Sequence, residues 1–178
     1  MWFADGAAIS ADASADGRFQ VVGLANDSAV VWDTRTGERI ATLTHGGPLF
    51  RVAISPSGDR VLTGGSDNAA RLWNVATEQV VGSAWVHPST VRAIAFSSAG
   101  DLVATGCQDG SLRITAIANG AARETVIEKQ PDGILELAFS PDNSRLASCF
   151  GTTSGHPGGA RLWDVKTGAP IGPLMAHG

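Results

Sequence analysis

The sequence predicts an all-β fold of about four repeated, four-stranded antiparallel sheets, and two observations support this prediction. A Ser that opens a turn recurs as Ser14, Ser55, Ser97 and Ser140, at separations of 41, 42 and 43 residues. The intervals contain short apolar runs bounded by Gly, Pro, Asn and Asp, and no long helical period. Short strands repeating at such a spacing are typical of β-propeller blades. We therefore expect a single propeller region over residues 1–178, with blades at approximately 5–45, 46–87, 88–130 and 131–178.

The second interval shows the expected blade in full. A Pro- and Gly-containing turn at Ser55–Asp59 precedes a strand at Arg60–Gly65, and a turn at Ser66–Ala69 precedes a strand at Ala70–Val75. A further strand is expected at Gln79–Ser83. Because one such sheet cannot bury both of its faces, it needs neighbouring sheets. The strands expected nearest the propeller axis are Ala8–Ala13, Phe50–Ile54, Val91–Phe96 and Leu135–Phe139.

Composition excludes several classes of function. The 178 residues carry a net charge of −4, so the chain has no basic footprint for nucleic acid or an anionic membrane. Cys107 and Cys149 lie in different repeats without a CxxC spacing, which indicates neither a disulfide framework nor a zinc site. The first residues, Met1–Asp16, are rich in Ala and Asp and resemble neither a signal peptide nor a transmembrane span. A cytoplasmic protein is expected.

Candidate catalytic or metal-binding groups are few. His45, His87 and His177 are separated by a repeat or more, which disfavours a shared metal site, and Asp67 and Asp109 are better explained as turn residues than as an acid–base pair. His156 lies in a Gly-rich insertion that lacks the Lys of a phosphate loop. We therefore expect no catalytic residue, no metal and no cofactor.

Repeated motifs carry a family resemblance over nearly the whole chain. Trp32-Asp33, Trp73-Asn74 and Trp163-Asp164 resemble the dipeptide that names the WD-repeat (WD-40) β-propellers. His45, His87 and His177 resemble the His that opens each repeat, although the Gly that precedes it in the family is absent. The turn Asp of the family is resembled by Asp67 and Asp109, and its strand hydroxyl by Thr63, Thr105 and Ser148.

In the family these four residue types form a buried hydrogen-bond network within a blade. The resemblance implies a complete network only in the second copy, from Thr63, Asp67, Trp73 and His87. The first copy has Trp32 and His45 but Asn26 for Asp and Val22 for the hydroxyl. The third copy has Thr115 in place of Trp, and the fourth has Thr152 in place of Asp.

The resemblance implies a non-catalytic scaffold that binds a protein or peptide. Family partners commonly meet side chains three and five residues beyond the His and one residue before the turn Asp. Phe50 and Arg92 are of the types most often found as binding hot spots. The full set carried onto this chain is Pro48, Phe50, Thr90, Arg92, Gly133 and Leu135, followed by Ala25, Ser66 and Gln108.

Two alternative functions remain open, and the number of blades leaves open how the propeller ring closes. Other propellers host enzymes with an axial-channel site, although this chain offers no axial cluster of His and carboxylates, and the chain could instead be the regulatory portion of a larger multidomain sensor. The family usually closes with about seven blades, within the propeller range of about 4–8. The resemblance is to a bacterial-type protein of four repeats or to a fragment of a longer propeller. For closure we expect either such a fragment or a symmetric homodimer that completes an eight-blade ring.

Overall fold

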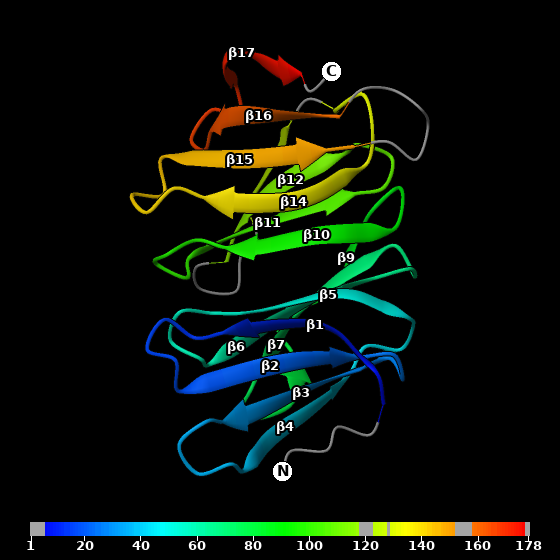
Figure 1. The fold of residues 1–178 in the computed structure, drawn as a ribbon, viewed down its shortest axis with the longest axis vertical. Coiled ribbons are helices and arrows are strands. Elements are labelled where there is room, and N and C mark those ends of the chain that lie inside the picture. The colour runs from blue at the N-terminus through cyan, green and yellow to red at the C-terminus, as the bar shows by residue number, and fades with distance from the viewer. Residues whose placement is uncertain (1–5, 118–122, 128, 152–157, 177–178) are drawn as a thin grey trace. The chain divides into compact units, whose positions relative to one another are not determined.

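The structure is a computed structural model that describes residues 6–117, 123–127, 129–151 and 158–176. Every regular element within these ranges is a β-strand (Figure 1), which confirms the all-β prediction. Nothing in the described part of the chain forms a helix long and apolar enough to cross a membrane. The chain divides into two compact units, residues 1–87 and residues 88–178, and each unit contains two antiparallel sheets.

The first unit holds two sheets whose strands follow one another in sequence order. Sheet A consists of β1 (Ala8–Ala13), β2 (Phe19–Leu24), β3 (Ser28–Asp33) and β4 (Arg39–Thr44). Sheet B consists of β5 (Leu49–Ile54), β6 (Arg60–Gly65), β7 (Ala69–Asn74), β8 (Gln79–Val80) and β9 (Trp85–Val86). The bounds of β1 and β6 are those predicted from the sequence.

The outer position of sheet B differs from the prediction. Instead of one strand over Gln79–Ser83, two strands of two residues each, β8 and β9, pair separately with β7. The chain leaves the sheet between them, where Gly82 has a φ of 74°. A glycine adopts this left-handed conformation readily. Val81 N still donates to Leu72 O of β7 at 2.7 Å, and the bend at Gly82 then separates β8 from β9.

The second unit repeats the same meander twice. Sheet C consists of β10 (Val91–Phe96), β11 (Leu102–Cys107), β12 (Leu112–Ala116) and β13 (Arg123–Ile127). Sheet D consists of β14 (Ile134–Phe139), β15 (Arg145–Phe150), β16 (Gly159–Asp164) and β17 (Pro170–Ala176). The four sheets agree with the prediction of repeated antiparallel blades.

Each unit has one hydrophobic core, shared by its two sheets. In the first unit β1 and β5 lie side by side (Figure 1), and the core combines Val21 and Leu43 of sheet A with Val61 and Trp73 of sheet B. In the second unit β10 and β14 are neighbours, and Leu112 of sheet C shares the core with residues of sheet D such as Ile134, Leu146 and Trp163. Burial of these side chains between two sheets is what a single sheet could not provide.

The recurring Ser builds the same turn in all four sheets. Its hydroxyl oxygen accepts a hydrogen bond from the backbone N–H five residues later, for example from Phe19 to Ser14 at 2.9 Å and from Arg60 to Ser55 at 3.0 Å. The third residue after the Ser has a positive φ in each copy, which explains the sequence preference for glycine. These residues are Gly17, Gly58, Gly100 and, in the last copy, Asn143.

Candidate functional site

A chain of hydrogen bonds crosses one end of sheet B. The indole Nε1 of Trp73 in β7 donates to Oγ1 of Thr63 in β6 at 2.9 Å, and this oxygen lies 2.8 Å from Nδ1 of His45. The other ring nitrogen of His45 lies 3.0 Å from Oδ1 of Asp67, whose second oxygen accepts from Arg71 at 2.6 Å. The loop before β5, the strands β6 and β7, and the turn between those strands are therefore joined by one polar network.

The histidine of this network differs from the sequence prediction. The sequence assigned His87 to Thr63, Asp67 and Trp73, but the structure places His45 there. His45 lies 18 residues before Thr63, in the loop that leads into β5, so its ring reaches the sheet that follows it in the chain. His87, which is buried, precedes Thr105 by the same 18 residues. His45 is therefore joined to the strands that follow it, β6 and β7.

Burial sets the charge of the His45 imidazole. Burial lowers the pKa of this imidazole below 6.5, although Asp67 acts in the opposite direction, so the ring is neutral at pH 7. Nε2 lies 3.0 Å from both Asp67 Oδ1 and Arg71 Nη1, and Nδ1 lies 2.8 Å from the Thr63 hydroxyl oxygen, so both ring nitrogens have polar neighbours. Burial raises the pKa of Asp67, but hydrogen bonds from Arg71 and His45 outweigh it and leave the pKa below its usual value.

A glycine next to this network makes room for the imidazole. A Cβ atom on Gly65 would lie 2.6 Å from Nε2 of His45 and 2.7 Å from the carbonyl oxygen of Pro48. Both distances are far below van der Waals contact, so any side chain at this position would displace the histidine or its loop. The network is therefore specified by the absence of a side chain as well as by its polar groups.

The other sheets keep parts of the network. In sheet D, Trp163 Nε1 donates to Ser148 Oγ at 2.9 Å, and both residues are buried. In sheet C the buried hydroxyl of Thr105 has no hydrogen-bond partner among the described residues, because Thr115 occupies the place of the Trp donor. Asp109 accepts from Lys129 at 3.0 Å.

Sheet A has the most altered copy. Asn26 accepts from the Ser28 hydroxyl at 2.6 Å, and Trp32, which is half-buried, lies beneath the Arg39 guanidinium. Val22 cannot supply the hydroxyl. Three further residues of the sequence prediction, His177, Thr152 and His156, lie outside the described residues.

A repeated backbone hydrogen bond ties the loop before each inner strand to the turn after the second strand. Ser66 N donates to Pro48 O, and Gln108 N donates to Thr90 O, both at 2.9 Å. Ala25 with Ala7 and Gly151 with Gly133 repeat this bond at the same spacing. Each unit has its own set of these sheet ends, which we call its His-loop edge: residues 7–9, 25–27, 45–50 and 66–68 in the first unit, and residues 90–92, 108–110, 133–135 and 151 in the second.

A β-bulge lies at the start of every inner strand. The pairing register shifts across Phe50 in β5, and the same shift occurs in β1, β10 and β14. A bulge adds one residue to one strand and re-aims its side chain, and bulges are frequent beside binding sites. The four bulged residues occupy equivalent positions of the repeat and are Ile9, Phe50, Arg92 and Leu135.

Each residue predicted for partner binding lies at the His-loop edge of its own unit, and its role in binding stays a prediction. Phe50 and Leu135 each expose 41% of their surface, which is high for large apolar side chains, and Arg92 is half-buried. Phe50 belongs to the first unit and Arg92 to the second. Of the remaining predicted residues, the exposed ones are Ala25, Pro48, Ser66 and Gln108, the half-buried one is Thr90 and the buried one is Gly133.

The sequence prediction missed one residue of this surface. Ile9 is the bulged residue of β1 and is 41% exposed, as Phe50 is. It was missed because positions were counted from a His, and the first copy has no His before its inner strand. The signal was nevertheless present, since Ile9 precedes Phe50 by 41 residues, the same step that separates Ser14 from Ser55.

The His, Cys, Asp and Glu residues of the described ranges are dispersed. Within 6–117, 123–127, 129–151 and 158–176, no three His, Cys, Asp or Glu residues come together in a way that could hold a metal ion. Both cysteines are free thiols, with Cys107 buried and Cys149 half-buried.

Repeated four-stranded meanders with a bulged inner strand and a Trp–hydroxyl hydrogen bond define a repeat protein built from sheets of the β-propeller type. The family model for the WD domain, G-beta repeat, matches residues 37–74, 80–115 and 124–164, which is more than half of the chain. The chain belongs to this family, as the Trp, His and Asp motifs predict.

Curated relatives and solved structures agree with this assignment. Eukaryotic translation initiation factor 3 subunit I of Neosartorya fischeri is 29% identical over 167 residues, covering 86% of this chain and 49% of the relative. The same subunit of Scheffersomyces stipitis is 38% identical over 142 residues, covering 79% of this chain and 28% of the relative. The chain thus spans half or less of the length of these two relatives.

Two solved structures show the fold alone, because their sequence identity is low. A chain of Kuenenia stuttgartiensis hydrazine synthase superposes with a TM-score of 0.83 at 14% identity and covers 98% of this chain and 53% of its own length. The computationally designed Ika4 protein superposes with a TM-score of 0.75 at 22% identity and covers 92% of this chain and 94% of its own length.

Proposed function

We propose that this chain is a non-catalytic WD-repeat scaffold that binds a protein or peptide partner through the His-loop edge. The observation that carries the proposal is a β-bulge at the same position of all four inner strands. The bulged residues, which occupy equivalent positions of the repeat, are Ile9, Phe50, Arg92 and Leu135. Three of these side chains are large and apolar, and each is 41% exposed. Exposed apolar side chains at a repeated structural position favour contact with another protein.

The His-loop edge is suited to binding because its backbone is already ordered. In sheet B, His45 is held by Thr63 and Asp67, and the bond from Ser66 N to Pro48 O closes the same loop. A surface fixed in this way loses little conformational entropy when a partner binds. The buried network therefore supports recognition indirectly, by positioning the loop that leads into Phe50.

The relatives support a partner within a multiprotein assembly. Their name describes them as a subunit of a translation initiation factor, so their partners include other proteins. We carry over to this chain the class of partner, a protein, and we propose a cytoplasmic location. The similarity to hydrazine synthase concerns the fold and favours no catalytic role.

The test starts with a pull-down from the native host, followed by calorimetry with the captured partner. Phe50→Ala and Arg92→Ala should each weaken binding by about 2 kcal/mol, roughly thirtyfold, if these residues are anchors. Val126→Ala is the matched control, because Val126 is 70% exposed but lies on β13, an outer strand. Unchanged affinity in both anchor variants would show that the partner uses another surface.

A further inference from the structure

The first unit contains a cavity at the end of its sheets opposite the His-loop edge. The cavity has a volume of about 270 Å³ and lies where the turns of sheets A and B meet. Its walls include Phe19 at the start of β2, Ile40 in β4, and Val75 just after β7. We call this end the Ser-turn edge, defined by residues 14–19, 34–40, 55–59 and 74–78. The volume is just below the range of about 300–1,000 Å³ found for small-molecule sites, and it suits a single side chain of a partner.

The aromatic wall of the cavity is held in place from two sides. A Cβ atom on Gly58 would lie 2.3 Å from Cδ2 of Phe19, so the ring packs directly on the glycine backbone, where φ is +77°. The Arg18 guanidinium lies 4.7 Å from the centroid of the same ring. Phe19 is therefore fixed before any partner arrives, which reduces the entropy cost of binding.

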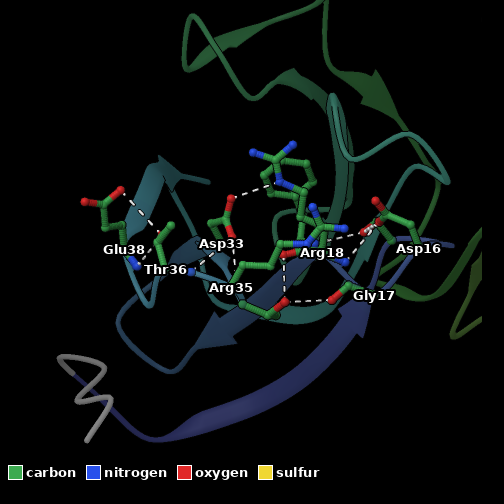
Figure 2. A network of polar contacts seen from close by, with 10 residues as sticks. Asp16, Gly17, Arg18, Asp33, Arg35, Thr36 and Glu38 are labelled. Carbon is green, nitrogen blue, oxygen red and sulfur yellow. Dashed lines mark hydrogen bonds and ion pairs between the residues drawn. The ribbon is translucent and has the colours of Figure 1, made fainter.

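A small polar network fixes Arg18 in turn. Figure 2 shows Arg18 directed at Asp33, and its Nε donates to Oδ2 at 3.0 Å. The Asp33 side chain is 5% exposed and also accepts from the backbone N–H groups of Arg35 and Thr36. The charge of Arg18 is thus compensated by Asp33, so it adds little repulsion toward a cation in the cavity.

The charged group that lines the cavity itself is a carboxylate, that of Asp59. Its Oδ1 accepts from the hydroxyls of Ser55 and Ser57, whereas Oδ2 accepts no hydrogen bond from the described residues and lies 3.9 Å from Arg60 Nε. Partial burial raises the pKa of Asp59, but the two hydroxyl donors and Arg60 outweigh burial and keep it below its usual value. The side chain is 60% exposed, so it is charged and accessible at neutral pH.

We infer that this cavity is a second docking site, which receives a lysine or arginine side chain of a protein partner. The aliphatic stem of the cation lies against Phe19, Ile40 and Val75, and its charged end reaches Oδ2 of Asp59. Long basic side chains combine these two properties, an apolar stem and a charged end. A purely apolar side chain would gain no charge interaction with Asp59, and an acidic one would be repelled by it. The chain's net charge of −4 further favours a basic partner.

This site goes beyond the proposed function, because the His-loop edge lies at the other ends of the same strands. In sheet B, Phe50 stands at the beginning of β5 and the Ser55–Asp59 turn follows its end. A scaffold with both sites could hold two partners at once, one at each end of the first unit.

Amide NMR of the isotope-labelled chain, titrated with Nα-acetyl-lysine methylamide and its arginine analogue, tests the inference. We expect saturable shifts of the amides of Phe19, Gly58 and Val75. The norleucine analogue has a similar stem without the charge, and it should bind about fivefold more weakly, as an accessible ion pair implies. Asp59→Asn should produce the same loss for lysine. Asp101→Asn is the matched control, since Asp101 accepts from Ser97 as Asp59 does from Ser55, but lies in sheet C.

A second variant keeps the test informative if Asp59→Asn disturbs its turn. Ile40 is 40% exposed at the cavity wall, so Ile40→Lys should leave the fold intact while repelling a cation. Equal binding of the lysine and norleucine analogues would show that the cavity receives an apolar side chain, and the inference of a basic occupant would be wrong. An absence of shifts in the wild-type chain, or binding that is insensitive to both variants, would overturn the site. Because Phe50 lies far along β5 from these residues, failure here leaves the proposed function standing.

Discussion

The same substitution at two equivalent threonines should change the free energy of unfolding by very different amounts. Thr63 in sheet B and Thr105 in sheet C are both buried, with 0% and 2% exposure. The Thr63 hydroxyl accepts from Trp73 and contacts Nδ1 of His45, whereas the Thr105 hydroxyl has no hydrogen-bond partner among the described residues. Replacement by Val keeps the shape of the side chain and removes only the hydroxyl.

The structure gives the expected magnitudes. Thr63→Val leaves two buried polar groups without a partner, the Trp73 indole N–H and the His45 ring nitrogen, and each costs about 1–3 kcal/mol. Because the two losses share one site, we expect a total of about 3 kcal/mol. Thr105→Val removes a hydroxyl that is already buried without compensation, so its free energy of unfolding should stay within about 0.5 kcal/mol of the wild type or increase.

Thermal and urea unfolding, followed by circular dichroism, measure the difference. A loss of about 3 kcal/mol corresponds to a fall in Tm of roughly 6–12 °C for a chain of this size. Tryptophan fluorescence adds a local readout, since Trp73 loses its partner only in the Thr63 variant. Similar midpoints for the two variants would refute the view that the hydrogen-bond chain, rather than burial of a threonine, stabilises sheet B.

Two further predictions concern pH and assembly. Burial lowers the pKa of His45 in the folded state, so the unfolded chain binds more protons below pH 6.5 and stability should fall as the pH drops through that value, by at most about 1.4 kcal/mol per pH unit. Urea midpoints between about pH 7.5 and about pH 5 should show this slope. The variant His45→Gln, which places at this position the residue type of Gln130, should flatten the slope. Parallel pH profiles for the variant and the wild type would contradict the assignment to His45. Light scattering should report a dimer or larger species, because β1 and β17 are edge strands whose residues are almost all exposed, and a uniform monomer would contradict the expected pairing of open sheets.

Local chemistry made much of the fold predictable. The recurring Ser with a glycine three residues later specifies a turn, and the structure shows that turn with its left-handed residue in all four sheets. Short apolar runs between such turns predicted the bounds of β6 and β10, and the repeat spacing predicted those of β1. The Trp and hydroxyl positions of sheets B and D were likewise recognisable, because an indole N–H in a core needs an acceptor nearby.

Features that depend on how segments meet were not predictable. Spacing alone does not tell whether Thr63 bonds the histidine before it or the one after it, and the register of β5 decides for His45. The bulges at Ile9 and Phe50 follow from strand pairing rather than from residue type. The cavity at Phe19 and Asp59 forms where turns of two sheets converge, so no single stretch of sequence predicts it.

The position of His45 has a consequence for how such a chain can be lengthened or shortened. The interval that contains a complete network begins at the histidine, at residue 45, and ends before the next one, at residue 87. A duplicated or excised segment with these limits carries its imidazole, hydroxyl, carboxylate and indole together, whereas one cut between His45 and β5 separates the ring from its acceptors. Gene duplication that respects the histidine boundary would add a repeat with its own stabilising network. Recombinant fragments should be divided at that same boundary.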